Sequence, residues 1–302
     1  MKVLLIGYGS IGKRHDEVLS TFKEITSIDI VTKQTLTSRN TFFKLQDIQD
    51  IRIYDYFVIA SETSKHYEQL EYLELNVKNK LIFCEKPLFE SSKSLEILKN
   101  EVYVGYVLRF HPLLKKLKKF IKDEKVLNIN INCGQYLPTW RPISDYRDSY
   151  SAKKEQGGGV LLDLSHEIDY MQYLCGEVDE LKSYQVKISD LEINSDDFTT
   201  LIGKTESGTF VNLSIDYISK ITHRKVLLNT LENTYELDFI NNRLVKKDKL
   251  GVEELFESDN LLRNQMFEAM HKSILTTKKD VCSYNSALDV MKTISKVQEQ
   301  NR

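Results

Sequence analysis

A glycine-rich turn close to the amino terminus has the spacing of a phosphate-binding loop. Gly-Tyr-Gly-Ser-Ile-Gly directly follows the apolar run 3–6 and directly precedes a helical stretch. In such a setting Gly7 permits a tight turn, Gly9 lets the backbone approach a pyrophosphate, and Gly12 lets the helix pack closely on the sheet. The helix N-terminus adds free N–H groups and a positive dipole end. The turn therefore predicts a bound dinucleotide, contacted by Gly7, Tyr8, Gly9, Ser10, Ile11 and Gly12.

The end of the next predicted strand, 27–32, is where proteins with this kind of glycine turn distinguish NAD from NADP. An acidic residue about 20 positions after the glycines would bind the ribose 2′-hydroxyl of NAD. This chain has Thr32 and Lys33 there, with Arg39 nearby, and Asp29 lies inside the strand. A hydroxyl beside a cation suits a 2′-phosphate, so we expect NADP in preference to NAD, contacted by Thr32 and Lys33. The alternative is that Lys33 is a solvated loop residue.

The glycine turn opens an alternation of short apolar strands and helices over residues 1–107. We expect strands at 3–6, 27–32, 56–61, 80–84 and 102–107, and helices from the turn to about 23, at 66–75 and at 91–99. This alternation implies an α/β fold of the Rossmann type, a doubly wound parallel sheet with right-handed crossovers. Ligands of such sheets bind at the carboxyl ends of the strands.

The pattern changes after about residue 108 to strands with alternating apolar residues. We expect them at 127–133, 181–188, 198–204, 209–217, 225–231 and 234–239. Alternation suits an antiparallel sheet with one face covered by helices. We therefore predict two domains. Residues 1–107 form an NAD(P)-binding domain, and 108–302 form an α+β substrate and oligomerisation domain with a largely antiparallel open sheet. The last helix, 286–300, could fold back onto the first domain.

The composition argues against a nucleic-acid-binding protein, a membrane-spanning protein and a metal-binding protein. Among the 302 residues, 42 Lys and Arg balance 44 Asp and Glu, which argues against the concentrated basic face of a nucleic-acid binder. No apolar run reaches the ~20 residues that cross a bilayer. The four cysteines have no metal-ligand spacing, so we expect no metal and a reducing, cytoplasmic setting.

A stretch rich in aromatic residues and arginines suggests the substrate. Aromatic rings suit the apolar faces of a sugar, and arginines suit a carboxylate or phosphate. We expect an anionic or nucleotide-linked sugar, and the alternative is interface aromatics with structural ion pairs. The residues are Tyr136, Trp140, Arg141, Tyr146, Arg147 and Tyr150.

Several segments together resemble the Gfo/Idh/MocA oxidoreductases. In the order of that family they are GYGSIGKRH (7–15), ASETSKHYEQL (60–70), FCEKPL (83–88), VGYVLRFHP (104–112) and GGGVLLDLSHEIDYMQYL (157–174). The resemblance covers most of the first domain and the first half of the second. It implies a Rossmann domain followed by an α/β domain whose open sheet often mediates oligomers, and a hydride transfer at a hydroxyl or keto group of a sugar, cyclitol or nucleotide sugar.

The resemblance also implies the site residues. Lys86, Asp163 and His166 would be the catalytic group, with Lys86 close to nicotinamide and substrate. Arg109, within the fourth segment, and His166 join the expected substrate contacts. The residues expected to line the cofactor, besides the glycine turn, are Ser61, Glu62, Thr63, His66, Glu85 and Lys86.

These residue types fit the chemistry. Oxidising an alcohol by hydride transfer needs a base for the hydroxyl proton and a cation for the developing alkoxide. His166 is the natural base, and Asp163 would orient it or relay its proton. Lys86 supplies the charge and could share the acid–base work. The family usually places the histidine four residues after the aspartate, whereas here the spacing is three. Both spacings keep the side chains on one helical face, and Glu167 and Tyr170 could share it.

Alternatives remain for these residues and for the function. His166 could cap a helix or pack between the domains, and Asp163 could form an ion pair with Lys153 or Lys154. A redox-neutral lyase or epimerase would hold its cofactor tightly and return it unchanged. A non-catalytic NAD(P)-binding regulator would lack one of Lys86, Asp163 and His166, and all three are present.

Overall fold

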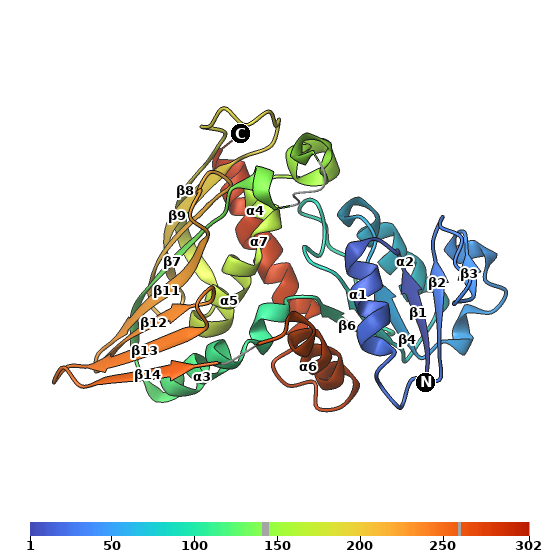
Figure 1. The fold of residues 1–302 in the computed structure, drawn as a ribbon, viewed down its shortest axis with the longest axis horizontal. Coiled ribbons are helices and arrows are strands. Elements are labelled where there is room, and N and C mark those ends of the chain that lie inside the picture. Colours follow the sequence, from blue (N-terminus) through green and yellow to red (C-terminus); the bar gives the residue numbers. More distant parts are fainter. Residues whose placement is uncertain (141–144, 259–260, 302) are drawn as a thin grey trace. The chain divides into compact units, whose positions relative to one another are not determined.

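The computed structural model describes residues 1–140, 145–258 and 261–301 (Figure 1). The chain divides into two compact units. The first consists of Met1–Val107 and Leu262–Leu288, and the second of Leu108–Leu261 and Asp289–Arg302. The segment Leu262–Leu288, which the sequence-based division assigned to the second domain, thus groups with the first unit.

Within the described residues, the first unit is built on a seven-stranded sheet with the order β15-β6-β5-β4-β1-β2-β3. Its neighbouring strands are parallel except for the pair β15 and β6. The strands are β1 (Lys2–Ile6), β2 (Ser27–Val31), β3 (Thr41–Phe42), β4 (Tyr56–Ile59), β5 (Leu81–Cys84), β6 (Glu101–Val104) and β15 (Cys282–Ser283). Consecutive residues of β1 and β4 are wholly buried, because a doubly wound sheet is covered on both faces.

The helices of this unit are α1 (Ser10–Leu19), α2 (His66–Asn76) and α6 (Arg263–Leu275), and α7 (Tyr284–Gln300) begins in it. Helices α1 and α6 are in contact. The strand order reverses beside β1, where the chain runs outward to β2 and β3 and then returns to β4 on the other side. Such a reversal is where doubly wound sheets bind ligands, at the carboxyl ends of the strands.

The helix predicted at 91–99 is wrong, because this crossover has no regular structure. Its backbone is held by side chains instead. The Glu74 carboxylate accepts hydrogen bonds from the N–H groups of Leu98 (2.9 Å) and Lys99 (2.7 Å). The Tyr284 hydroxyl accepts one from the N–H of Leu95 and donates one to the Leu95 carbonyl. These bonds supply partners that a helix would otherwise provide.

Within the described residues, the second unit contains an eight-stranded sheet with the order β14-β13-β12-β11-β7-β10-β9-β8. All neighbours are antiparallel except β7 and β10. The strands are β7 (Val126–Gly134), β8 (Val178–Val186), β9 (Phe198–Thr205), β10 (Phe210–Asp216), β11 (His223–Thr230), β12 (Asn233–Asp238), β13 (Arg243–Asp248) and β14 (Glu253–Glu257). The expected α/β class, a Rossmann sheet plus a largely antiparallel one, is confirmed.

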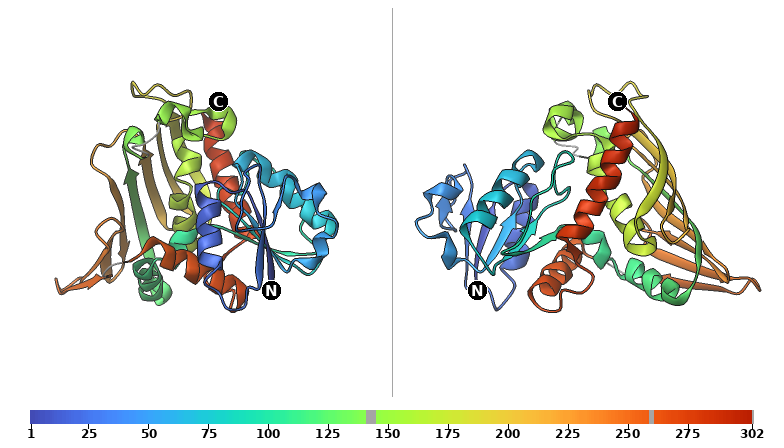
Figure 2. Two further views of the ribbon diagram at one scale, coloured as in Figure 1. Left: turned by 45° about the vertical axis from the view of Figure 1, so that its right-hand side comes forward. Right: turned by 180° about the vertical axis from the view of Figure 1, so that it is seen from behind.

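Helices cover one face of this second sheet and leave the other bare (Figures 1 and 2). They include α3 (Pro112–Phe120), α4 (Val160–Asp163) and α5 (His166–Cys175). Strand residues alternate accordingly, with Ile129 and Ile131 buried and with Ile202 and Phe210 59% and 62% exposed. Single turns of 3₁₀ helix lie at Leu45–Asp47, Ile51–Ile53, Thr63–Lys65, Val107–Phe110, Ile121–Asp123, Leu137–Thr139, Tyr146–Asp148, Tyr150–Ala152 and Lys154–Gln156.

No helix in the described part of the chain is long and apolar enough to cross a membrane.

Candidate functional site

The predicted phosphate-binding turn connects β1 to α1, and two of its glycines are required by close backbone contacts. Gly7 has a φ of 98°, and a Cβ atom there would lie 2.6 Å from the Ala60 carbonyl oxygen. A Cβ at Gly12 would lie 2.3 Å from the carbonyl oxygen of Gly7. A Cβ at Gly9 would meet nothing within 4 Å. The backbone at Gly9 thus borders open space, as the approach of a pyrophosphate requires.

The first turn of α1 supplies donors at the same place. The helix begins at Ser10, and Gly9 stands before it in an extended conformation. The first N–H groups of a helix have no acceptor within the helix and carry the positive end of its dipole. The turn and the helix start therefore fit a dinucleotide pyrophosphate, and Ser10 and Ile11 are the first two residues of the helix.

Near the strand end that is predicted to select between NAD and NADP, several side chains contact Asp16. Its carboxylate accepts hydrogen bonds from the Tyr8 hydroxyl (2.8 Å) and from the Arg39 guanidinium (2.7 Å). Arg39 is thereby engaged by an ion pair. The Thr32 hydroxyl accepts a hydrogen bond from the N–H of Gln34, and the exposed Lys33 ammonium lies 5.9 Å from the Phe43 ring centroid.

Residues after β4 and β5 are tied to each other through His66. This imidazole is 1% exposed, and its Nδ1 lies 3.1 Å from the carbonyl oxygen of Pro87. Burial lowers the pKa of His66, which favours the neutral ring. The Ser61 hydroxyl donates to Gln69, and Glu62 pairs with Lys65, so these two predicted cofactor contacts also have protein partners. Thr63 begins the 3₁₀ turn Thr63–Lys65 between them.

Glu85 and Lys86 stand at the carboxyl end of β5. The Glu85 side chain is buried, and its Oε1 lies 2.9 Å from Nε2 of His15. Its Oε2 accepts a hydrogen bond from the backbone N–H of Lys86 at 3.0 Å. The peptide bond from Lys86 to Pro87 is cis. Lys86 itself is half-buried.

The second unit holds Asp163 and His166, but not on one continuous helix as expected. Asp163 is the last residue of α4, and His166 is the first residue of α5. Asp163 is 5% exposed, and its Oδ2 accepts a hydrogen bond from the Tyr217 hydroxyl at 2.5 Å. Burial and the Asp163 charge raise the pKa of Tyr217, so this phenol keeps its proton.

Tyr217 was missed by the sequence reasoning. It directly follows β10 and is wholly buried, and its ring lies 5.2 Å edge-on from the predicted substrate residue Trp140. Its separation of 54 residues from Asp163 leaves no local spacing signal. Only the sheet topology brings the two side chains together.

Glu167 and Tyr170 have other partners. The buried Glu167 carboxylate pairs with Arg224 at 2.8 Å. The buried Tyr170 ring packs against Phe239, with centroids 5.4 Å apart. Both side chains thus contribute to the interior under α5.

Two predicted substrate arginines are bound by carboxylates. Arg109 is 6% exposed and forms a fork with Asp169, with contacts of 2.7 and 3.0 Å. The exposed Arg147 pairs with Asp145 and with Glu192. Arg141 lies outside the described residues, and the Tyr146 hydroxyl accepts a hydrogen bond from the N–H of Glu192.

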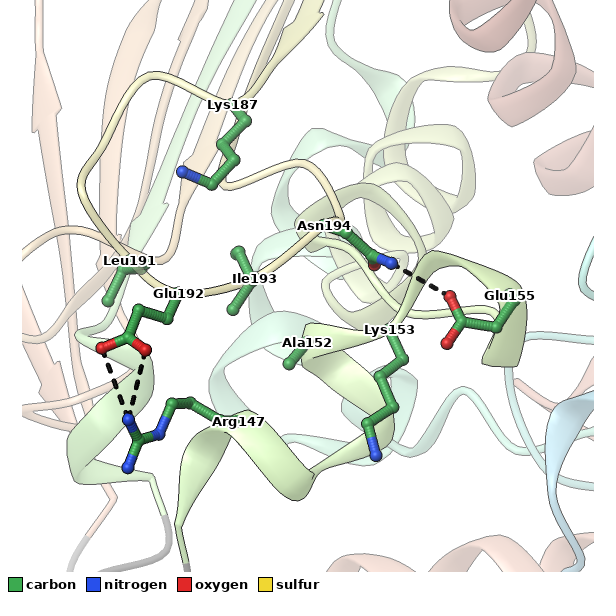
Figure 3. Close-up of a pocket in the computed structure, with 9 residues that line it drawn as sticks. All are labelled: Arg147, Ala152, Lys153, Glu155, Lys187, Leu191, Glu192, Ile193 and Asn194. Atoms are coloured by element: carbon green, nitrogen blue, oxygen red, sulfur yellow. Dashed lines mark hydrogen bonds and ion pairs between the residues drawn. The ribbon is translucent and has the colours of Figure 1, made fainter.

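Arg147 lies at the rim of a pocket of about 550 Å³ in the second unit (Figure 3). The dashed contacts in Figure 3 join Arg147 to Glu192 and Asn194 to Glu155. The lining includes neither Asp163 nor His166, so this pocket is separate from the predicted catalytic side chains. It is lined by Arg147, Ala152, Lys153, Glu155, Lys187, Leu191, Glu192, Ile193 and Asn194.

Comparison with known proteins gives one family match. Residues 115–237, from α3 to β12, match the model of the GFO/IDH/MocA C-terminal domain. The chain is also similar to 2,7-anhydro-N-acetylneuraminate hydratase of Escherichia coli (strain K12), with 29% identity over 136 residues. That match covers 43% of this chain and 36% of the hydratase, so it spans about a third of the relative's length.

Solved structures match along the whole chain. Levoglucosan dehydrogenase in complex with NADH and levoglucosan has a TM-score of 0.84 at 16% identity, covering 99% of this chain and 96% of that one. UDP-N-acetylglucosamine 3-dehydrogenase GnnA from Acidithiobacillus ferrooxidans has a TM-score of 0.78 at 16% identity, covering 100% and 97%. At such identity the likeness establishes the fold.

Proposed function

We propose that this chain is a nicotinamide-dependent oxidoreductase of the Gfo/Idh/MocA family, which the domain match at residues 115–237 and the fold support. It would transfer a hydride between the cofactor and a hydroxyl or keto carbon of a sugar. The observation that carries the proposal is the turn at Gly7–Gly12, which opens beside Gly9 at the point where the strand order reverses.

Each predicted catalytic side chain has a task that its chemistry can perform. When bound, the nicotinamide accepts or returns the hydride. The Lys86 ammonium stabilises the negative charge that develops on the substrate oxygen. His166 takes the hydroxyl proton, since its ordinary pKa lies near neutrality. Asp163, already bonded to the Tyr217 hydroxyl, offers a fixed carboxylate in the same unit.

For the substrate we propose an anionic or nucleotide-linked sugar. Trp140 beside Tyr217 offers an aromatic surface of the kind that binds a sugar face. GnnA, whose name specifies a nucleotide sugar, supports the same class through its fold. Arg109 and Arg147 are already paired with carboxylates of the protein. To bind an anionic substrate, one of these arginines would have to exchange its carboxylate partner for the substrate, or Arg141 would have to bind it.

For the cofactor we propose NADP in preference to NAD. The exposed Lys33 beside the Thr32 hydroxyl supports this choice, whereas Arg39 is already neutralised by Asp16. Replacing Lys33 with alanine should then weaken NADP binding and leave NAD binding within about twofold, because only the 2′-phosphate meets the ammonium.

The deciding experiment is a calorimetric titration of nucleotide-free protein with NAD and NADP, followed by a screen of free and nucleotide-linked sugars for a change in nicotinamide absorbance. Binding of either dinucleotide with turnover of a sugar supports the proposal. Absence of binding of both at millimolar concentration would overturn it.

A redox-neutral reaction is a second candidate. The similar Escherichia coli protein is named a hydratase, and addition of water changes no overall oxidation state. Such an enzyme would be purified with its dinucleotide and would convert substrate with none added. Mass spectrometry of the nucleotide released on denaturation separates this candidate from the first.

The expected cytoplasmic location and the homo-oligomer through the C-terminal sheet stay predictions.

A further inference from the structure

A line of buried hydrogen bonds crosses the first unit from β4 to the end of β5. The Tyr56 hydroxyl lies 2.8 Å from Nδ1 of His271. Nε2 of His271 lies 2.8 Å from Nδ1 of His15, and Nε2 of His15 lies 2.9 Å from Oε1 of Glu85. Tyr56, His15 and His271 are 0% exposed, and Glu85 is 8% exposed. We refer to these four residues as the buried relay.

The chemistry of the groups determines which one donates and which one accepts each hydrogen bond in the buried relay. Burial raises the pKa of Tyr56 well above its ordinary value, so its O–H keeps the proton and can donate. Burial and the neighbouring His15 lower the pKa of His271 well below 6.5, so its ring is neutral and has one N–H. A hydrogen bond accepted at Nδ1 places that N–H on Nε2, facing His15.

The same logic fixes the proton on His15. Its Nδ1 accepts from His271, so its own N–H lies on Nε2 and points at the Glu85 carboxylate. In the opposite order, the hydrogen of His15 would lie on Nδ1, its Nε2 would face the carboxylate with a lone pair, and the Tyr56 hydrogen would lose its acceptor. Because each buried donor then has an acceptor, the order from Tyr56 to Glu85 satisfies every member.

Aromatic neighbours hold the two imidazole rings in place. The Phe83 ring of β5 lies 4.9 Å from His15 and 5.1 Å from His271, and the Phe267 ring of α6 lies 5.5 Å from His15. The relay thus depends on four elements, α1, α6, β4 and β5. Close packing leaves the rings little freedom to rotate away from their partners.

The relay ends on the backbone of the predicted catalytic lysine. Glu85 Oε2 accepts the N–H of Lys86, while Oε1 is held by His15. We propose that His15 and His271 are positioning residues, which fix the Glu85 carboxylate and through it the backbone from which Lys86 projects. This proposal rests on the proposed function for the role of Lys86, but the hydrogen bonding it describes can be tested without turnover.

The test measures amide hydrogen exchange at Lys86 in the full chain and kcat with saturating cofactor. His271→Phe keeps an aromatic ring but removes both imidazole nitrogens. It should speed exchange at the Lys86 amide about tenfold and lower kcat by about the same factor, the effect of losing one supported hydrogen bond. The amides of β1 should keep their protection, and the Kd for the cofactor should change less than about threefold. Tyr56→Phe removes only the hydroxyl and should act in the same direction with a smaller effect.

Leu73→Ala is the matched control, because it loosens the core of the first unit at α2 and changes neither a relay residue nor a ring packed against one. It should lower the melting temperature without faster exchange at Lys86 relative to β1. The proposal is overturned if His271→Phe leaves the Lys86 amide protected, or if exchange rises equally throughout the sheet. Failure to bind any dinucleotide would instead count against the proposed function, since the exchange measurement needs no cofactor.

Discussion

Glu85 and Lys86 are adjacent in sequence but have different tasks in the structure. Both Glu85 oxygens are bonded within the protein, one to His15 and one to the Lys86 N–H. A buried carboxylate with both oxygens satisfied acts as a fixed part of the backbone support. The half-buried Lys86 side chain, at a carboxyl strand end, is the one that we propose for the chemistry.

Replacing Lys86 with alanine therefore tests the catalytic role proposed for this residue. Loss of a cation that stabilises a developing alkoxide should lower kcat by about 10²–10³-fold, while the Kd for the dinucleotide changes little. Steady-state kinetics with a sugar found in the screen, together with calorimetry, measure both quantities. Lys93→Ala, which removes an exposed lysine paired with Glu90 in the same unit, is the control and should behave like the parent. Parental turnover by Lys86→Ala would refute the assignment.

At the scale of elements, the order of strand, glycine turn and helix at β1–α1 was predictable from the sequence, although α1 ends at Leu19 and not near residue 23. Its glycine spacing has a steric cause, and the same backbone contacts appear in the structure. The crossover at 91–99 was not predictable, since its bonds come from the distant Glu74 and Tyr284. Strands β13 and β14 were missed because both are rich in charged residues, which form cross-strand pairs such as Lys246–Glu254, and because β14 is an edge strand of the sheet.

The candidate site shows the same division. The sequence placed Asp163 and His166 close together, but the helix break between them depends on tertiary packing, and Tyr217 reaches Asp163 only through the fold. His15 lies within the motif GYGSIGKRH (7–15), whereas its partner His271 is 256 residues away. Long-range partners of this kind leave no periodic signal in a single sequence.

Two glycine variants test whether the turn between β1 and α1 needs close backbone packing at Gly12 and open space at Gly9. Gly12→Ala places a Cβ 2.3 Å from the Gly7 carbonyl oxygen, so it should destabilise the fold by about 1–3 kcal/mol and abolish cofactor binding. Gly9→Ala meets no protein atom within 4 Å and should unfold like the parent, yet bind the dinucleotide at least about tenfold more weakly. Urea unfolding and calorimetry give the two readouts. Equal cofactor affinity in Gly9→Ala and the parent would show that no pyrophosphate lies there.

At the scale of the whole molecule, each unit has its own core and holds some of the predicted site residues. Lys86 and the glycine turn belong to the first unit, and Asp163 and His166 belong to the second. Buried histidines occur in both units. Burial lowers the pKa values of His66 and His271 in the first and of His111 in the second.

These histidines predict the pH dependence of stability. A folded-state pKa below the ordinary 6.5 means that the unfolded chain binds protons first as pH falls. Stability is therefore fully present above 6.5 and declines as pH falls toward the folded pKa values. Each histidine contributes about 1.4 kcal/mol per tenfold loss of proton affinity. Unfolding free energies measured between about pH 7 and pH 5 should fall, and His271→Phe should flatten the curve. A slope unchanged in that variant would contradict the assignment.

The bare sheet face of the second unit predicts self-association. Tyr184, Ile202 and Phe210 are 69%, 59% and 62% exposed on neighbouring strands. Exposed apolar side chains gathered on one face mark interaction surfaces. Analytical ultracentrifugation should find an oligomer for the parent and a monomer for Ile202→Asp. The control Leu250→Asp changes a residue that is 83% exposed in the turn between β13 and β14 and should leave the assembly intact. A monomeric parent would refute this prediction.

The return of residues 262–288 to the first unit has a consequence for biosynthesis. The Rossmann strands leave the ribosome early, yet α6 supplies His271 and β15 pairs with β6 only after most of the chain has been translated. Domains ordinarily fold in order of emergence. Here the nascent amino-terminal third would lack the His271 partner of His15 and the β15 partner of β6. A chain stalled before residue 262 should therefore bind nucleotide poorly and should bind chaperones.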